Sequence, residues 1–156
     1  MDSRVTVSIR KAEARDLADL LAVLSQLAPL DPPLDSGSDT IRRAWGEIQS
    51  QPLREVLVAE AGGQVVGTVD WYLTPNLTHG GRPYVTIENF VVDSAHRRQG
   101  VGTALLNAVI AEAKGAGCYK VQLQSDIKRG DAHRFYEAVG FKPSAQGYRR
   151  YFEKRA

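Results

Sequence analysis

The sequence predicts an α/β fold, with a central sheet of six to seven strands flanked by about four helices. Three observations lead to that prediction. The chain has 156 residues, enough for a full hydrophobic core, and we expect one domain over residues 1–156. Its periodic segments follow one another in the order β-α-α-β-β-β-α-β-α-β-β. A glycine-containing turn joins a strand to a helix downstream of the middle of the chain.

The first third of the chain predicts one strand and two helices. Residues 5–9 alternate between apolar and polar side chains, which indicates a strand. Residues 14–28 place their leucines on one face of a helix. After a loop rich in proline, glycine and aspartate, Ser38 or Asp39 can cap a second helix, which ends at residues 51–52.

A hairpin and a central strand are expected next. Residues 54–61 and 64–73 predict two strands joined by Gly62-Gly63, a turn of the right length for a hairpin. Residues 84–92 predict another strand. Because this strand is nearly apolar on both faces, we expect it in the middle of the sheet.

The last part of the chain predicts two further helices and three strands. An apolar stripe along residues 105–113 indicates a helix, and residues 119–123 indicate a strand. A helix is expected over residues 131–139. Phe141 and then residues 147–152 predict the last pair of strands.

Composition and charge exclude several classes of protein. The formal net charge is +2 and the pI about 8.8, too weak a basic excess to indicate a nucleic-acid binder. No apolar run is long enough to span a bilayer, and the N-terminus lacks the apolar core of a signal peptide, so no membrane contact is expected. Cys118 is the only cysteine, which excludes an internal disulfide and favours a reducing, cytoplasmic location.

The glycine-containing turn has the features of a phosphate cradle. It runs between an apolar strand end and an amphipathic helix, through Arg97, Arg98, Gln99, Gly100, Val101, Gly102 and Thr103. Glycines let backbone N–H groups converge, a helix N-terminus adds unpaired donors, and arginines add charge-assisted contacts. A P-loop would need a lysine here, and a dinucleotide fingerprint would need a third glycine near Leu105. Neither is present.

This Arg-x-x-Gly-x-Gly pattern resembles the coenzyme A loop of the GNAT superfamily, the acetyl-CoA-dependent N-acyltransferases. The order of elements is also similar to the GNAT fold over essentially the whole chain. The resemblance implies acetyl-CoA as cosubstrate, no metal, and a mixed sheet whose parallel central strands, around Val91 and Leu123, splay to admit the pantetheine arm. It also implies cofactor contacts at the strand end, by Phe90, Val91 and Val92, and along the whole turn from Arg97 to Thr103. The alternative is an ordinary glycine-rich turn.

A second motif supports the resemblance. Phe135-Tyr136-Glu137 followed by Gly140-Phe141 is similar to the family's Phe-Tyr-Glu-x-x-Gly-Phe motif. Carried over, Tyr136 is the candidate general acid for the leaving thiolate, and Phe135 lines the route of the cofactor. The alternative is that both rings belong to the buried face of their helix. One position departs from the family, because Arg129 stands where many relatives have an asparagine.

Glu88 is the candidate for the acceptor side. Period two places Glu88, Phe90 and Val92 on one face of the strand. An acidic group in an apolar strand is costly unless it has a partner or a task, and desolvation there would make its carboxylate a stronger base. The strand around it is similar to that of glucosamine-phosphate N-acetyltransferases, in which the equivalent acidic residue contributes to the acceptor site. The alternative is an ion pair with Arg82, Arg134 or a lysine.

The acceptor and the assembly are the open points. We expect direct acetyl transfer to a primary amine of a small molecule, framed by the loops at residues 30–38 and 74–83. Aspartates in the first loop suit a cationic amine, whereas Arg82 and His79 suit a phosphorylated or carboxylated one. A protein or peptide amine, and a non-catalytic acetyl-CoA-binding regulator, remain alternatives. The family often pairs through its sheet edge or its C-terminal strands, so we expect a homodimer with apolar contacts from Tyr148, Tyr151 and Phe152.

The three histidines carry no predicted role in catalysis. Their positions in the sequence are His79, His96 and His133, and this spacing indicates no metal site.

Overall fold

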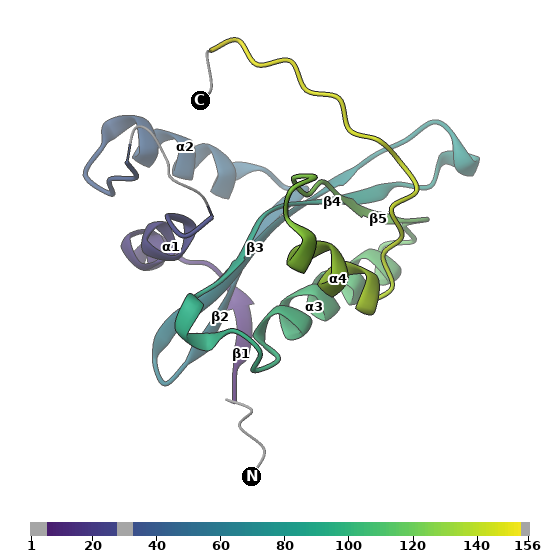
Figure 1. Ribbon diagram of the computed structural model, residues 1–156. Helices are drawn as coiled ribbons and strands as arrows, with labels where there is room; N and C mark the ends of the chain where they lie inside the picture. The colour runs from purple at the N-terminus through teal and green to yellow at the C-terminus, as the bar shows by residue number, and fades with distance from the viewer. Residues whose placement is uncertain (1–5, 28–32, 154–156) are drawn as a thin grey trace. The chain divides into compact units, whose positions relative to one another are not determined.

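Figure 1 shows the computed structural model of the chain, which describes residues 6–27 and 33–153. The chain divides into two compact units, Met1–Leu123 and Gln124–Ala156, and each is described by itself. The first unit contains the whole sheet and three of the four α-helices found in the described residues.

The sheet of the first unit is mixed, as the sequence predicts. Its strands are β1 (Ser8–Lys11), β2 (Arg54–Ala61), β3 (Gln64–Thr74), β4 (Tyr84–Val92) and β5 (Val121–Leu123). They lie in the order β1-β2-β3-β4-β5. The first three pairs are antiparallel and β4 pairs with β5 in parallel. The hairpin at Gly62-Gly63 and the bounds of β2 and β4 confirm the sequence prediction.

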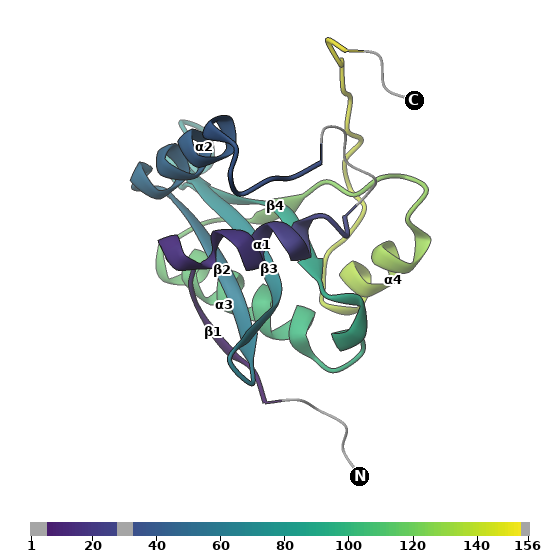
Figure 2. The same ribbon diagram turned by 90° about the vertical axis from the view of Figure 1, so that its left-hand side faces the viewer.

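Helices cover both faces of this sheet. A 3-10 turn, η1 (Ala14–Asp16), leads into α1 (Leu17–Leu24), and α2 (Asp39–Ser50) and α3 (Val101–Gly115) follow. α1 and α3 lie on opposite faces (Figure 1, Figure 2). On the side of α1 the core gathers Leu20, Val23, Trp45, Val58, Val65 and Val91.

The packing of α3 depends on one glycine. A Cβ at Gly67 of β3 would lie 3.1 Å from side-chain carbons of Val101 and of Leu105, both of which are fully buried. The missing side chain therefore lets the start of α3 approach the sheet closely. This contact fixes the helix N-terminus that follows the glycine-containing turn.

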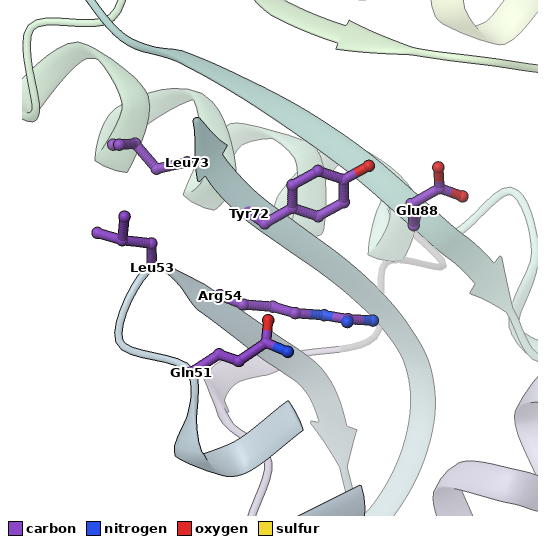
Figure 3. A pocket seen from close by; sticks show the side chains of 6 residues that line it. All are labelled: Gln51, Leu53, Arg54, Tyr72, Leu73 and Glu88. Carbon is purple, nitrogen blue, oxygen red and sulfur yellow. The ribbon is translucent and has the colours of Figure 1, made fainter. Parts of the chain in front are cut away.

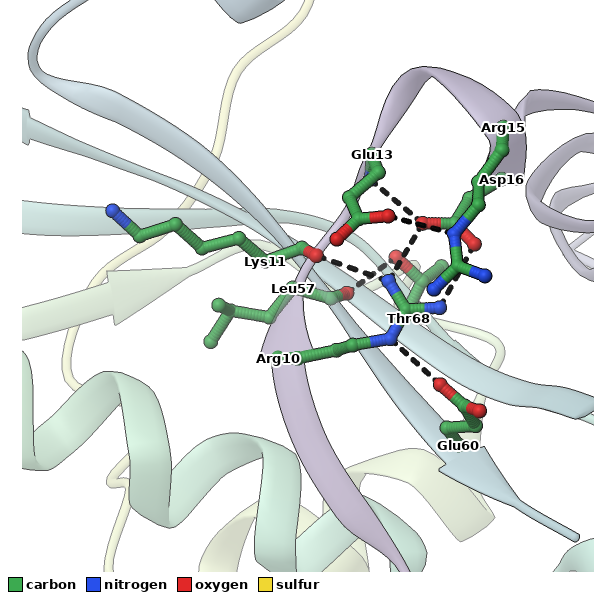
Figure 4. A network of polar contacts seen from close by, with 8 residues as sticks. All are labelled: Arg10, Lys11, Glu13, Arg15, Asp16, Leu57, Glu60 and Thr68. Carbon is green, nitrogen blue, oxygen red and sulfur yellow. Dashed lines mark hydrogen bonds and ion pairs between the residues drawn. The ribbon is translucent and has the colours of Figure 1, made fainter. Parts of the chain in front are cut away.

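An ion-pair network ties β1 to the start of α1 (Figure 4). Arg10 donates from Nη1 and Nη2 to the carboxylate of Asp16, at 2.7 and 2.9 Å, and from Nε to Glu60 at 2.6 Å. The backbone N–H of Glu13 also donates to Asp16, at 2.6 Å. These bonds, above all those from Arg10, lower the pKa of the buried Asp16 to about 2. The network therefore stabilises the folded state most when Asp16 is ionised.

The second unit is built around one helix, α4 (Gly130–Ala138). The ring of Tyr136 lies 5.7 Å from that of Phe135 and 6.1 Å from that of Phe141, between ring centroids. Gly140 adopts φ 98°, which turns the chain so that Phe141 N–H donates to the carbonyl of Tyr136 at 3.0 Å. The Phe-Tyr-Glu-x-x-Gly-Phe motif thus forms the C-terminal end of α4 and the turn that follows it.

The prediction of six to seven strands is wrong. The described residues form five, and neither Phe141 nor residues 147–152 belong to a strand. Tyr148 is 84% exposed and Phe152 is 95% exposed. Their aromatic rings suggested strands, but Pro143 and Gly147 interrupt the segment and charged neighbours leave no continuous apolar face to bury.

The start of the chain also differs in detail. The first strand covers Ser8–Lys11 rather than residues 5–9, and residue 5 lies outside the described residues. The single helix predicted over residues 14–28 is a 3-10 turn followed by α1, and residue 28 lies outside the described residues. Ser38, not Asp39, caps α2, since its hydroxyl accepts the N–H of Ile41 at 3.4 Å.

Candidate active site

A β-bulge interrupts β4 at the centre of the candidate site. In the β3–β4 ladder Asp70 faces Glu88 and Thr68 faces Val91. Two residues of β4, Asn89 and Phe90, therefore stand opposite one residue of β3, and Asn89 has φ 49°. The bulge places Val91, not Phe90, on the face of Glu88. The predicted alternation of Glu88, Phe90 and Val92 is thus wrong, because a period of two does not survive an extra residue.

The same stretch of β4 also extends past its parallel neighbour. The β4–β5 ladder pairs Val85, Thr86 and Ile87 with Val121, Gln122 and Leu123, and it ends there. Within the first unit, residues 88–92 continue without β5.

The glycine-containing turn begins directly after that edge. A 3-10 turn, η3 (Ser94–His96), leads to Arg97, and the backbone of Arg98 and Gly100 has φ 61° and 84°. α3 starts at Val101, so the N–H groups of Val101, Gly102 and Thr103 belong to its first turn. In the described part of the chain these three N–H groups donate to no acceptor.

The turn therefore has the helix N-terminus and the unpaired N–H groups expected from the sequence, and its role as a phosphate cradle stays a prediction. The side chains of both arginines are exposed, and Arg97 Nε donates to the carbonyl of Val92 at 3.3 Å. Gln99 Nε2 approaches the carbonyl of Ala95 at 3.5 Å. A helix N-terminus with exposed arginines is suited to a phosphate or pyrophosphate.

An anchor that the sequence did not reveal holds this turn. Asp93 accepts from Gln26 Nε2 at 2.7 Å and pairs with His96 Nδ1 at 2.8 Å. Gln26 in turn accepts the N–H of Ser94 at 2.9 Å. The bond from Gln26, followed by the one from His96, lowers the pKa of Asp93. Gln26 and Asp93 are 67 residues apart, and no local pattern links them.

A pocket of about 420 Å³ opens on the same face of the sheet as Glu88. Figure 3 shows the side chains that line it: Gln51, Leu53, Arg54, Tyr72, Leu73 and Glu88. They come from the end of α2 and from β2, β3 and β4. Of these residues, the sequence singled out Glu88 alone.

Arg54 is held rigidly at this pocket. Its Nε and Nη2 donate to the two carboxylate oxygens of Asp70, at 3.0 and 2.5 Å. The side chain of Asp70 is only 6% exposed, and that of Arg54 is 25% exposed. These bonds raise the pKa of Arg54 above its ordinary value. The guanidinium is therefore a fixed cation at the pocket wall.

Tyr72 supplies the neutral polar group of the pocket. Burial, and then the charge of Glu88, raise the pKa of the Tyr72 hydroxyl. Thr86 faces Tyr72 in the β3–β4 ladder, where its hydroxyl opposes this rise in pKa and accepts from Gln122 Nε2 at 3.2 Å. Tyr72 therefore keeps its proton at neutral pH.

Glu88 differs from the sequence prediction in its environment. Its side chain is exposed, so the desolvation that we expected there is absent. Thr86 and Val91 on the same face of the strand are buried, whereas Glu88 lines the pocket. The alternative ion pairs are not found in the described part of the chain either. Arg82 donates to the carbonyl of His79, and Arg134 pairs with Asp131.

The second unit holds the other two predicted residues. Tyr136 is buried, whereas Phe135 is partly exposed. Burial raises the pKa of Tyr136, opposed by the positive charge of Arg129. A protonated hydroxyl is what a general acid requires. That Tyr136 and Phe135 meet the cofactor stays a prediction.

The remaining titratable groups fit structural roles. The His79 ring stacks on Tyr119 at 3.9 Å between centroids, and His133 bonds to the carbonyl of Asp126 at 2.8 Å. Within residues 6–27 and 33–153, no three His, Cys, Asp or Glu side chains come together as metal ligands would. Cys118 is half-buried, which raises the pKa of its thiol.

None of the described helices has the length and apolarity to cross a bilayer.

Comparison with known proteins agrees with this geometry. Residues 20–141 match the model of the acetyltransferase (GNAT) family. The chain belongs to the GNAT family. It is 33% identical over 142 residues to glucosamine 6-phosphate N-acetyltransferase of Trypanosoma brucei brucei, an alignment that covers 91% of this chain and 93% of that protein. GNAT enzymes take the acetyl group from acetyl-CoA.

Two further similarities frame the activity of this GNAT protein. It is 37% identical over 87 residues, 56% of each chain, to aminoalkylphosphonate N-acetyltransferase of Salmonella typhimurium. A crystal structure described as a transcriptional regulator from Bacillus halodurans C-125 superposes with a TM-score of 0.87 at 36% identity. That superposition covers 94% of this chain and all of the other.

Proposed function

We propose that this GNAT enzyme transfers the acetyl group of acetyl-CoA directly to the primary amine of a small molecule. The observation that carries the proposal is the position of the bulge of β4. On one side of it the strand edge leads into the turn with unpaired N–H groups, and on the other lies the pocket with Glu88. The two relatives named above act on small-molecule amines, which supports this kind of acceptor.

The cofactor side uses backbone groups. The pyrophosphate would accept the N–H groups of Gly100 to Thr103 and contact Arg97 and Arg98. Phe90, Val91 and Val92 lie beyond the end of the β4–β5 ladder, and the pantetheine arm could lie beside them. This arrangement would end with the thioester beside the bulge.

The acceptor side uses Glu88. An exposed carboxylate attracts the ammonium form of the amine and can take its proton, directly or through a water molecule. The amine nitrogen then attacks the thioester carbonyl carbon, the C–S bond breaks, and the nitrogen releases its second proton to solvent, from which Tyr136 is reprotonated. We assign to the hydroxyl of Tyr136 the proton that the leaving thiolate gains, and to Phe135 the wall of the cofactor route. No covalent intermediate and no metal is required.

A non-catalytic acetyl-CoA-binding regulator is the second candidate. The likeness to a protein described as a transcriptional regulator favours it. It would need the turn at residues 97–103 but neither Glu88 nor Tyr136. A protein or peptide amine is a third candidate, although a pocket of about 420 Å³ suits a small acceptor better.

Three further points belong to the proposal. The two units form a single domain, because the family match extends across their boundary. The enzyme is a homodimer, with the exposed rings of Tyr148 and Phe152 as apolar contacts. It acts in the cytoplasm, in line with a single cysteine.

A screen of amines with acetyl-CoA, read as release of the free thiol, tests the function. We expect thiol release that depends on a small primary amine. Acetyl-CoA that raises the melting temperature without any amine-dependent release would favour the regulator instead.

A further inference from the structure

The acceptor pocket contains a cation that the proposed reaction does not use. Arg54 opens into the pocket beside Gln51, Tyr72 and Glu88 (Figure 3). Acetyl transfer to an amine needs a site for the ammonium group and a base, and Glu88 supplies both. A guanidinium beside the acceptor therefore calls for another explanation.

Asp70 fixes Arg54 but leaves donors unused. Arginine has five N–H donors, and Asp70 takes one from Nε and one from Nη2. Both N–H groups of Nη1 and one of Nη2 remain. In the described part of the chain they have no acceptor within hydrogen-bond distance. A planar fork with fixed orientation and free N–H groups is suited to an oxyanion.

The strand register places this fork next to Glu88. Asp70 faces Glu88 directly in the β3–β4 ladder, and Arg54 lies one strand further, opposite Tyr72. Because the guanidinium bonds to Asp70, it lies at the β3 residue that faces Glu88. Facing side chains on neighbouring strands lie about 5 Å apart at Cβ. A carboxylate and a cation, which form no ion pair with each other in the described residues, thus line the same pocket.

We propose that Arg54 is an anion subsite, and that the acceptor is a small primary amine carrying a phosphoryl, phosphonate or carboxylate group. Its ammonium group binds Glu88 and its oxyanion binds the free N–H groups of Arg54. The amide of Gln51 lies beside the same end of the pocket and can add a donor. Asp70 is a positioning residue, which holds the fork in place without touching the acceptor. This inference rests on the proposed function.

The first experiment compares matched acceptors on the wild-type enzyme. The pairs are glucosamine 6-phosphate with glucosamine, 2-aminoethylphosphonate with propylamine, and β-alanine with propylamine. Thiol release from acetyl-CoA gives kcat and KM for each. We expect kcat/KM to be at least tenfold higher for the charged member of one or more pairs, and the pairs distinguish phosphoryl, phosphonate and carboxylate groups.

This comparison distinguishes failure of the anion subsite from failure of the proposed function. Equal rates within every pair, or transfer to other amines and to no charged member, would overturn the anion subsite and leave the acetyltransferase standing. Absence of thiol release with any amine in the wider screen would contradict the proposed function itself, and the anion subsite with it.

The second experiment removes the fork. Arg54→Gln should raise KM for the charged acceptor on the order of 10- to 100-fold, the scale of losing charge-assisted hydrogen bonds, with KM for the neutral partner unchanged. Because this change leaves buried Asp70 unpaired, the double variant R54Q/D70N is measured beside it. Arg43→Gln, an exposed arginine of α2 outside the pocket, is the matched control for a lost charge.

The double variant decides between recognition and structure. For an anion subsite it folds stably and still fails to prefer the charged acceptor. If the double variant recovers the wild-type preference, or if Arg54→Gln affects charged and neutral acceptors equally, Arg54 serves only to satisfy Asp70 and the proposal is wrong. A loss of preference in Arg43→Gln as large as in Arg54→Gln would also contradict it.

Discussion

The two sides of the candidate site are built in different ways. The proposed cofactor side is one continuous stretch, residues 89–103, whose backbone shape is set by a bulge and by Gly100 at φ 84°. The acceptor pocket collects Gln51, Arg54, Tyr72 and Glu88 from four elements. In the proposed function, one side would bind through backbone N–H groups and the other through side chains. A site made of backbone groups from one stretch can be predicted from local sequence. A site made of side chains from several strands depends on strand register, which local sequence does not show.

The first test removes the hydroxyl oxygen of Tyr136. Tyr136→Phe should lower kcat on the order of a hundredfold, the usual scale for losing a proton donor. Acetyl-CoA binding should stay the same, because only the hydroxyl is lost. Burial raises the pKa of Tyr136, so the wild-type rate should show no loss of the acid form through neutral pH. Stopped-flow thiol release and calorimetric titration measure the two quantities.

Wild-type kcat in that variant, with chemistry shown to be rate-limiting, would count against the acid. Tyr136 would then be an aromatic residue of the α4 motif alone. Tyr84→Phe, a half-buried tyrosine of β4 outside the pocket, is the matched control.

The second test acts on the backbone of the cofactor side. Gly100→Val should abolish the rise in melting temperature that acetyl-CoA causes, a loss of affinity of tenfold or more. A Cβ at Gly100 meets no atom within 4 Å, but a β-branched residue is strained at φ 84° and would stand before the N–H groups. Differential scanning fluorimetry with and without acetyl-CoA gives the shift.

Gly62→Val is the control for strain. Gly62 also has a positive φ, 57°, and open space around it, but it lies in the β2–β3 hairpin. It should lower the melting temperature and keep the acetyl-CoA shift. Equal acetyl-CoA shifts in both variants would remove the turn from the binding site.

The third test weakens the anchor of the same turn. Asp93→Asn should raise KM for acetyl-CoA severalfold, roughly 1 kcal/mol for a weakened charge-assisted bond, without changing KM for the amine. Gln49→Ala, an exposed residue of α2, should change neither. Because the folded-state pKa of Asp93 is lowered, the anchor is complete above the ordinary value of 3.8 and is lost as pH falls through the lower folded value. An unchanged KM for acetyl-CoA would mean that the turn holds its shape without Asp93.

The fourth test targets stability and leaves both sides of the site intact. Arg10→Met should destabilise the fold by about 1–3 kcal/mol, because buried Asp16 loses its partner. The pKa of Asp16 is lowered from 3.8 to about 2, so its contribution is present above pH 3.8 and disappears as pH falls toward 2. Urea unfolding at pH 7 and pH 3 should show a smaller difference in the variant. A changed KM for either substrate at 25 °C would show that the network supports the site as well.

The sequence predicted the fold best where the signal was local. The hairpin at Gly62-Gly63 and the apolar run of β4 combine turn chemistry with side-chain pattern, and their bounds came out right. Phe141 and residues 147–152 lacked a continuous apolar face, so their aromatic rings misled the prediction. The bulge at Asn89 could not be predicted, because one extra residue does not change the composition of the strand in a recognisable way.

The site shows the same division. The turn from Arg97 to Thr103 was predicted from its glycines and its place before a helix. Arg54 and Asp70 were missed because their pairing joins residues 16 apart on two strands of a hairpin, and neither stands out alone. Glu88 was singled out because its side chain was expected to be buried, but the structure shows this side chain exposed.

The proposed acetyl transfer depends most on Glu88 as the acceptor residue. The direct measurement is thiol release against amine concentration for the wild type, Glu88→Gln and Glu47→Gln, across pH. We predict that Glu88→Gln raises KM for the amine about tenfold, the scale of a lost ion pair, with KM for acetyl-CoA unchanged. The loss of rate should be greatest at low pH, where the amine is protonated, and the exposed Glu47 of α2 should have no effect. An amine KM and a pH profile in Glu88→Gln equal to those of the wild type would contradict the account.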